Sequence, residues 1–185
     1  DGSSSLYYDR VRFAYFDTRI LQREGAEKDY TEEELRKVAE LDKVSTEAEK
    51  DELVDAIIVK TQGFVNGNIR EGDKNPVAIF KRLLSLYDGI DRDALRENMR
   101  YFLSAIMPVC EEYGVNMCVH PDDPPFQILG LPRIVTNEED IDLFLRAVDN
   151  PHNGLTFCAG SLSAGEHNDT RELAKKFAKR THFVH

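Results

Sequence analysis

The stretch that decides the fold reads VNMCVH and occupies residues 115–120, between Gly114 and Pro121. Two runs of similar character follow it, LTFC at 155–158 and THFVH at 181–185. Short apolar runs that are rich in β-branched and aromatic residues, and that turn-forming residues bound, are typical of buried strands. We therefore predict three strands in the second half of the chain.

A helical pattern precedes each of these three runs. The patterns cover residues 91–113, 137–148 and 169–177, and each begins on a residue that commonly caps a helix. We expect Pro108 to bend the first of these helices or to start a new turn. Strands that alternate with helices at this spacing form βα units, so the sequence predicts an α/β fold with a parallel sheet.

The first 90 residues have a different rhythm, with three helical patterns and no convincing strand. The patterns cover residues 31–43, 46–62 and 75–89, and a loop rich in Gly and Asn lies at 63–74. We predict that residues 1–90 form a helical insertion and that residues 91–185 form the βα units. A chain of this length is expected to form one domain.

Composition and charge restrict the partners. Among 185 residues, 34 Asp and Glu outnumber 24 Lys and Arg, and the formal net charge is −10. This charge argues against a nucleic-acid partner, whereas an anionic substrate stays open because a bound metal ion supplies local positive potential. No apolar run approaches the roughly 20 residues of a membrane helix. The three cysteines follow no disulfide or zinc-ribbon spacing, which indicates a reducing cytoplasm.

The two ends of the chain predict that it is an excerpt of a longer protein. It has no initiator Met, and it stops at His185 directly after a strand-like run. A strand that ends on a functional-looking residue, with nothing after it, is an unusual natural C-terminus.

Each predicted strand ends on a potential metal ligand, in chain order His120, Cys158 and His185. The carboxyl edge of parallel strands is where sites are built, in open α/β sheets and in barrels alike. Imidazole together with thiolate suits a first-row transition ion such as Mn, Fe, Co or Zn, and disfavours Mg or Ca. We predict that the three residues bind one divalent ion; the alternative is that each is an ordinary buried residue.

The neighbours of these ligands differ in what they indicate. For Cys118 we favour a small buried hydrophobe. Cys158 differs because small residues follow it and allow close approach of a backbone or a ligand, and we expect Gly160 and Ser161 to bind substrate. His182 lies three residues before the last ligand, so strand alternation places it on the opposite face of the sheet.

Asp122 and Asp123 stand in the run HPDDPP at 120–125. Carboxylates beside a ligand could orient its imidazole, contact substrate hydroxyls or act as a general base. Asp with flanking prolines also makes turns, which is the structural alternative. We predict a catalytic role for both residues and substrate contact for Asp122. Glycosidase chemistry is disfavoured, because adjacent residues cannot flank a scissile bond.

Longer runs in the chain resemble the mannonate dehydratase family. They are MCVHPDDPPF at 117–126, ILGLPRI at 128–134, NGLTFCAGSL at 153–162, HND at 167–169 and HFVH at 182–185. Shorter matches upstream, among them DGS at 1–3 and DYT at 29–31, extend the resemblance over nearly the whole chain.

The resemblance implies a (β/α)8 TIM barrel of the xylose-isomerase-like kind, of which this chain would hold about three parallel strands and a helical insertion. It also implies dehydration of D-mannonate to 2-keto-3-deoxy-D-gluconate in hexuronate breakdown, by loss of the C2 proton and the C3 hydroxyl, with Mn²⁺ or Fe²⁺ as cofactor. The family holds its metal with two His, one Cys and one Asp, and His120, Cys158 and His185 match the first three. The Asp, and a His and a Tyr associated with proton transfer, have no counterpart in this chain. We expect a homo-oligomer in the cytoplasm.

Two other functions stay open at this point. One is a metal-dependent sugar isomerase or epimerase of the same fold, but such sites rely on carboxylates and His with few thiolates, so Cys158 counts against it. The other is a non-catalytic fragment or partner-binding module, which the missing barrel strands favour for the chain as given.

Overall fold

The computed structural model describes residues 7–60, 69 and 74–185. Two compact units divide the chain, Asp1–Asp88 and Gly89–His185. Among the described residues, none of the helices has the length and apolar character needed to cross a membrane.

The first unit is helical in its described part. Its elements are α1 (Arg10–Tyr15), the π-helical η1 (Phe16–Leu21), the 3-10 turn η2 (Ala26–Asp29), α2 (Glu32–Val44), α3 (Glu47–Val54), the π-helical η3 (Asp55–Lys60), α4 (Pro76–Leu84) and the 3-10 turn η4 (Ser85–Tyr87). The three helices predicted for this half begin where expected, capped by Thr31, Thr46 and Asn75. The end of the second predicted helix and most of the predicted loop at 63–74 lie outside the described residues.

The helix α1 is an element that no sequence pattern had indicated. Asp9 caps it by accepting hydrogen bonds from the backbone N–H groups of Val11 and Arg12. Directly after it, the carboxylate of Asp17 is fully buried and accepts hydrogen bonds from Arg23 and from the Tyr30 hydroxyl. A buried charge must be paired. This network therefore ties Arg23 and Tyr30, which follow η1 in the chain, to Asp17 within η1.

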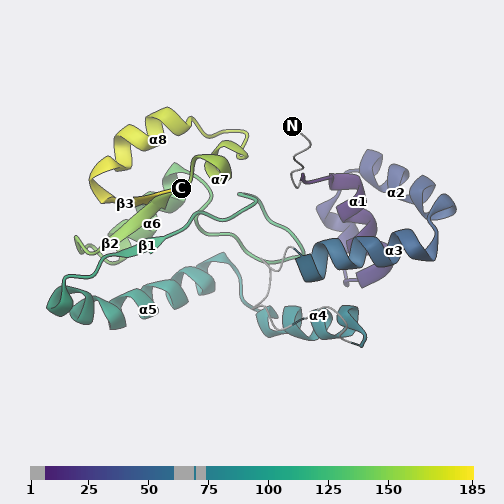
Figure 1. The fold of residues 1–185 in the computed structure, drawn as a ribbon, viewed down its shortest axis with the longest axis horizontal. Coiled ribbons are helices and arrows are strands. Elements are labelled where there is room, and N and C mark those ends of the chain that lie inside the picture. The colour runs from purple at the N-terminus through teal and green to yellow at the C-terminus, as the bar shows by residue number, and fades with distance from the viewer. Residues whose placement is uncertain (1–6, 61–68, 70–73) are drawn as a thin grey trace, which may run out of the picture. The chain divides into compact units, whose positions relative to one another are not determined.

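The second unit alternates helices and strands. Its elements are α5 (Arg92–Tyr113), β1 (Met117–Val119), α6 (Glu138–Ala147), β2 (Asn153–Phe157), α7 (Ala159–Ser163), α8 (Thr170–Phe177), the 3-10 turn η5 (Ala178–Arg180) and β3 (Thr181–Val184). The strands form one parallel sheet in the order β1-β2-β3 (Figure 1). The predicted α/β fold with three parallel strands is confirmed, and α5 continues through Pro108 without a break.

Helices cover one face of this sheet. Leu155 and Phe157 alternate on β2, and both belong to a buried cluster with side chains of α5, α6 and α8. Asn153 faces the same side, since its side-chain amide donates to the Phe144 and Val148 carbonyls of α6 and its C-cap. Gly154 and Thr156 therefore lie on the opposite face of the sheet. By the same alternation, Cys158, the residue directly after β2, lies on this face too.

Asp140 ties α6 to α5 through a buried ionic network. Its side chain, 2% exposed, accepts hydrogen bonds from Arg92 Nη2 at 2.7 Å and Arg96 Nη2 at 2.8 Å. The Thr136 hydroxyl donates at 2.6 Å and the Thr136 backbone N–H at 3.1 Å. Burial alone would raise the pKa of Asp140, but hydrogen bonds from Thr136 and Arg96 outweigh it and lower the pKa. The carboxylate is therefore ionised at neutral pH and fixes the two helices against each other.

Candidate metal centre

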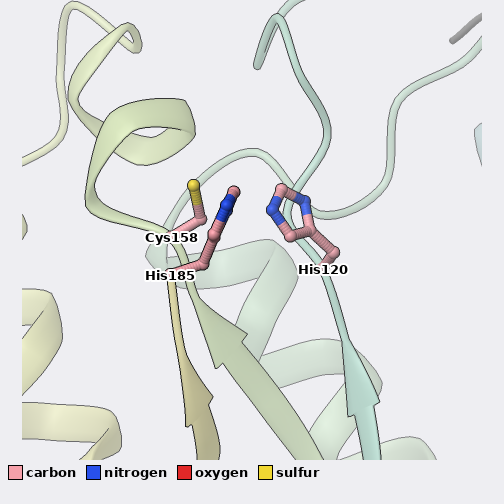
Figure 2. Close-up of side chains that lie close together, drawn as sticks. All are labelled: His120, Cys158 and His185. Atoms are coloured by element: carbon pink, nitrogen blue, oxygen red, sulfur yellow. The ribbon is translucent and has the colours of Figure 1, made fainter.

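Three side chains meet just beyond the carboxyl ends of the strands. His120, Cys158 and His185 each directly follow the last residue of β1, β2 and β3. Parallel pairing brings these ends to one edge of the sheet. The His185 N–H extends the pairing of β2 and β3 by one residue, because it donates to the Phe157 carbonyl at 2.9 Å. Figure 2 shows the three side chains projecting from this edge toward one another.

The three potential ligand atoms form a tight group. One nitrogen of each imidazole and the Cys158 sulfur all lie within 4.8 Å of one another. The rings of His120 and His185 have centroids 5.7 Å apart and meet at 61°, so they approach edge to face and do not stack. Because the rings are not stacked, one nitrogen of each can lie close to the sulfur at the same time. The three residues that end the predicted strands therefore lie together, as the parallel sheet led us to expect.

Hydrogen bonds favour the cation-binding forms of His120 and Cys158. His120 Nδ1 lies 2.7 Å from the Pro121 carbonyl, which can only accept, so Nδ1 carries the proton and Nε2 keeps its lone pair. Burial would raise the pKa of the Cys158 thiol, but the hydroxyl and backbone N–H of Ser161, together with His120, outweigh it and lower the pKa. The thiolate is the form that binds a metal ion.

Asp122 holds the loop after β1. Its Oδ2 accepts hydrogen bonds from the backbone N–H groups of Ile134 and Val135, both at 2.8 Å, and Arg133 Nη1 lies 3.4 Å from Oδ1. The Asp122 N–H in turn donates to the Val135 carbonyl at 2.9 Å. Asp123 is exposed. Of the two adjacent carboxylates, one is engaged by the protein backbone and the other faces solvent.

Gly160 and Ser161 lie in α7, directly after Cys158. Gly160 is exposed, and a Cβ added there would meet the Cys158 sulfur at 3.9 Å, an ordinary contact, so no close approach requires glycine. Ser161 is 3% exposed, and its hydroxyl lies 3.1 Å from the same sulfur. This contact had not been predicted, although a serine three residues after a potential cap residue is a signal that could have indicated it.

The remaining cysteines and His182 lie apart from the group. Cys118 lies within β1 and is half-buried, and Cys110 is buried; both are free thiols. The prediction that His182 lies on the opposite face of the sheet from His185 is wrong: its ring lies beside Gly154, where an added Cβ would be 2.1 Å from Cδ2. Gly154 points away from the helices, because Asn153 and Leu155 on either side of it point toward them. His182 is held there by a 2.9 Å contact between Nε2 and the Pro151 carbonyl.

Comparison with known proteins shows where this chain belongs. A mannonate dehydratase of Marinomonas sp. (strain MWYL1) is 39% identical over 185 residues, which are 100% of this chain and 46% of the relative. One of Rhizobium meliloti (strain 1021) is 38% identical over 184 residues, again 100% of this chain, and 44% of the relative. The chain thus spans less than half the length of these curated relatives.

Solved structures and family models agree with the sequence relatives. The crystal structure of mannonate dehydratase from Streptococcus suis serotype2 matches with a TM-score of 0.54 and 39% identity, over 62% of this chain and 34% of that chain. The model of the D-mannonate dehydratase (UxuA) family matches residues 1–185. The chain therefore belongs to the D-mannonate dehydratase family.

Proposed function

We propose that the protein of which this chain forms part dehydrates D-mannonate to 2-keto-3-deoxy-D-gluconate in hexuronate catabolism, and that His120, Cys158 and His185 hold its divalent ion. One observation carries the proposal: ligand atoms from three successive strand ends lie within 4.8 Å of one another. Membership of the D-mannonate dehydratase family supports the substrate and the reaction.

The donor set fits a first-row ion. Ligands at roughly 2.0–2.3 Å from a common centre lie about 3.5 Å apart, so small side-chain rotations would close the group around an ion. One thiolate and two imidazoles suit Mn²⁺ or Fe²⁺, our proposed cofactors, better than Mg²⁺ or Ca²⁺. When bound, such an ion supplies Lewis acidity to the carboxylate and neighbouring hydroxyl oxygens of a sugar acid.

The sheet and its helices support a partial (β/α)8 barrel. All three strands are parallel, helices lie between them in sequence, and the group of ligands lies at the carboxyl edge, as in barrels of this class. We propose that β1, β2 and β3 are consecutive barrel strands and that the first unit is an insertion into the barrel.

The chain's own residues have separate roles in the proposed reaction. Dehydration removes a proton from C2 and a hydroxyl from C3, so the site needs a base and an acid near the ion. Asp122 and Asp123 are the proposed catalytic carboxylates on this chain, with Asp122 ordering the loop and Asp123 exposed to accept a proton or bind a hydroxyl. Gly160 and Ser161 border the sulfur and are the proposed substrate contacts, beside Asp122.

The three free cysteines support a cytoplasmic location for the protein, because disulfides are rare in that compartment. We also propose a homo-oligomer. Apolar side chains that are exposed on α5, such as Tyr101 and Val109, are available for contact with a second subunit.

A pair of cysteine variants of the full-length protein tests the proposal. Cys158→Ser should strongly reduce both retained metal, measured by elemental analysis, and formation of the 2-keto-3-deoxy product. Cys118→Ser should change neither, because Cys118 lies outside the group of ligands. Equal metal content in the two variants would remove Cys158 from the site. Product with the mass of the substrate would identify an isomerase or epimerase instead.

A further inference from the structure

Ser161 makes an unusual use of its polar groups. Its hydroxyl oxygen lies 3.1 Å and its backbone nitrogen 3.4 Å from the Cys158 sulfur, so one residue directs two donors at one atom. The residue is 3% exposed and the sulfur belongs to a residue that is 6% exposed. Because both residues are buried, solvent competes little with these hydrogen bonds.

The neighbouring serine of α7 shows the ordinary alternative. Ser163 donates its hydroxyl to the Gly160 carbonyl at 3.0 Å, the local side-chain-to-backbone bond that serines commonly form in helices. Ser161 directs its hydroxyl at the sulfur instead. Of these two serines of α7, only Ser161 directs its hydroxyl at the Cys158 sulfur.

The backbone next to Cys158 is fixed by a hydrogen bond to the neighbouring strand end. The Ala159 N–H donates to the His185 carbonyl at 3.3 Å, which joins the start of α7 to the residue after β3. Cys158 and Ser161 are therefore held on a backbone that is itself tied to a second proposed ligand. The hydroxyl and the backbone N–H of Ser161 both contact the sulfur and so restrict rotation of the Cys158 side chain.

We propose that Ser161 is a positioning residue of the metal centre, which orients the Cys158 sulfur and reduces the electron density that it donates to the bound ion. This inference rests on the proposed function, because it requires Cys158 to be a ligand. Groups that hold a metal ligand in place commonly change metal affinity by 10–100-fold when they are removed. Because the backbone donor stays in every variant, the lower end of this range applies to the hydroxyl.

Three variants of the full-length protein test the role of the hydroxyl. Ser161→Ala removes the hydroxyl and leaves no large cavity, Ser161→Thr keeps it, and Ser163→Ala removes a hydroxyl from the same helix that does not contact sulfur. Each is loaded with Co²⁺ for absorption spectroscopy and titrated with Mn²⁺ for affinity.

The expected result is specific to an effect on the sulfur. In Ser161→Ala, the sulfur-to-cobalt charge-transfer band should move to longer wavelength, because loss of a hydrogen bond raises the energy of the sulfur electrons. The Mn²⁺ dissociation constant should rise about 10-fold. Ser161→Thr should restore both values, and Ser163→Ala should match the unmodified protein. Should Ser161→Thr not fold, the comparison of the two alanine variants still decides.

Two results would overturn the inference, and they are distinguishable. An unchanged band and an unchanged Mn²⁺ affinity in Ser161→Ala would show that the hydroxyl has no effect on the ligand, while the metal centre stands. Absence of any sulfur-to-cobalt band in the unmodified protein would remove Cys158 as a ligand and would refute the proposed metal centre as well.

Discussion

Replacing Asp140 by Asn tests the network that joins α5 and α6. The substitution keeps the size of the side chain but removes the charge that pairs with Arg92 and Arg96. Breaking a fully buried ion pair costs about 3–5 kcal/mol. Here the arginine side chains are 47% and 31% exposed and can be solvated again, so we expect a loss of about 2–3 kcal/mol.

The assay is urea denaturation of the full-length protein followed by circular dichroism, with Asp142→Asn as the matched control. Asp142 lies on the same helix, and its partners Lys176 and Arg146 are 39% and 75% exposed. A surface pair of this kind contributes under about 1 kcal/mol. Equal losses in the two variants would refute the assignment of the energy to burial.

The pH dependence gives a second measurement of the same network. Because the folded-state pKa of Asp140 is lowered, its stabilisation is fully present above the unfolded pKa of about 3.9 and is lost as pH falls through the folded value. The difference between the unmodified protein and Asp140→Asn should therefore be constant near neutrality and shrink in acid. A difference that stays unchanged down to strongly acidic pH would contradict the ionic origin of the effect.

Three further predictions concern other parts of the chain. Gly154→Ala should destabilise the protein by about 1–3 kcal/mol in the same denaturation assay, because its methyl group would overlap the His182 ring, whereas Gly160→Ala, with 3.9 Å of space, should be nearly neutral. Hydrogen bonding from Arg10 lowers the pKa of Glu34 to about 2, so Glu34→Gln should reduce stability at neutral pH but not below pH 2, and a carboxyl titration by NMR near the ordinary value of 4.5 would contradict this. Residues 1–185 alone should form no 2-keto-3-deoxy product from D-mannonate with Mn²⁺, since the resemblance places further catalytic groups beyond them; measurable product would show that this map of the site is wrong.

Local signals explain why so much of the fold could be predicted. Thr31, Thr46, Asp91, Asn137 and Asp169 all cap helices in the structure, and each had been identified from its own short neighbourhood. A cap depends on a hydrogen bond to a residue two or three positions away, so it is visible within a few letters of sequence. The five-residue α7 escaped prediction because it is too short to show a helical period.

Contacts between distant residues were not visible in the same way. The carboxylate of Asp122 binds the backbone of Ile134 and Val135, 12 and 13 positions away, and backbone N–H groups leave no mark on the sequence. The choice between a turn-forming and a catalytic Asp122 therefore could not be made from the HPDDPP run. By contrast, the meeting of the three ligands needed only the rule that parallel strands end at one edge.

The pairing of β2 and β3 shows where the rule of strand alternation stops applying. Alternation from His182 to His185 places the two rings on opposite faces, but the register shifts between Leu155 and Thr156, where Thr181 and Phe183 are the successive partners. An irregularity of this kind absorbs one residue and reverses the facing of the residues after it. His182 therefore points beside Gly154 and His185 still reaches the Cys158 sulfur, both away from the helices. With Leu155 paired to Thr181, a strict register would have left His182 on this face and turned His185 to the other, so the irregularity is part of what assembles the group of ligands.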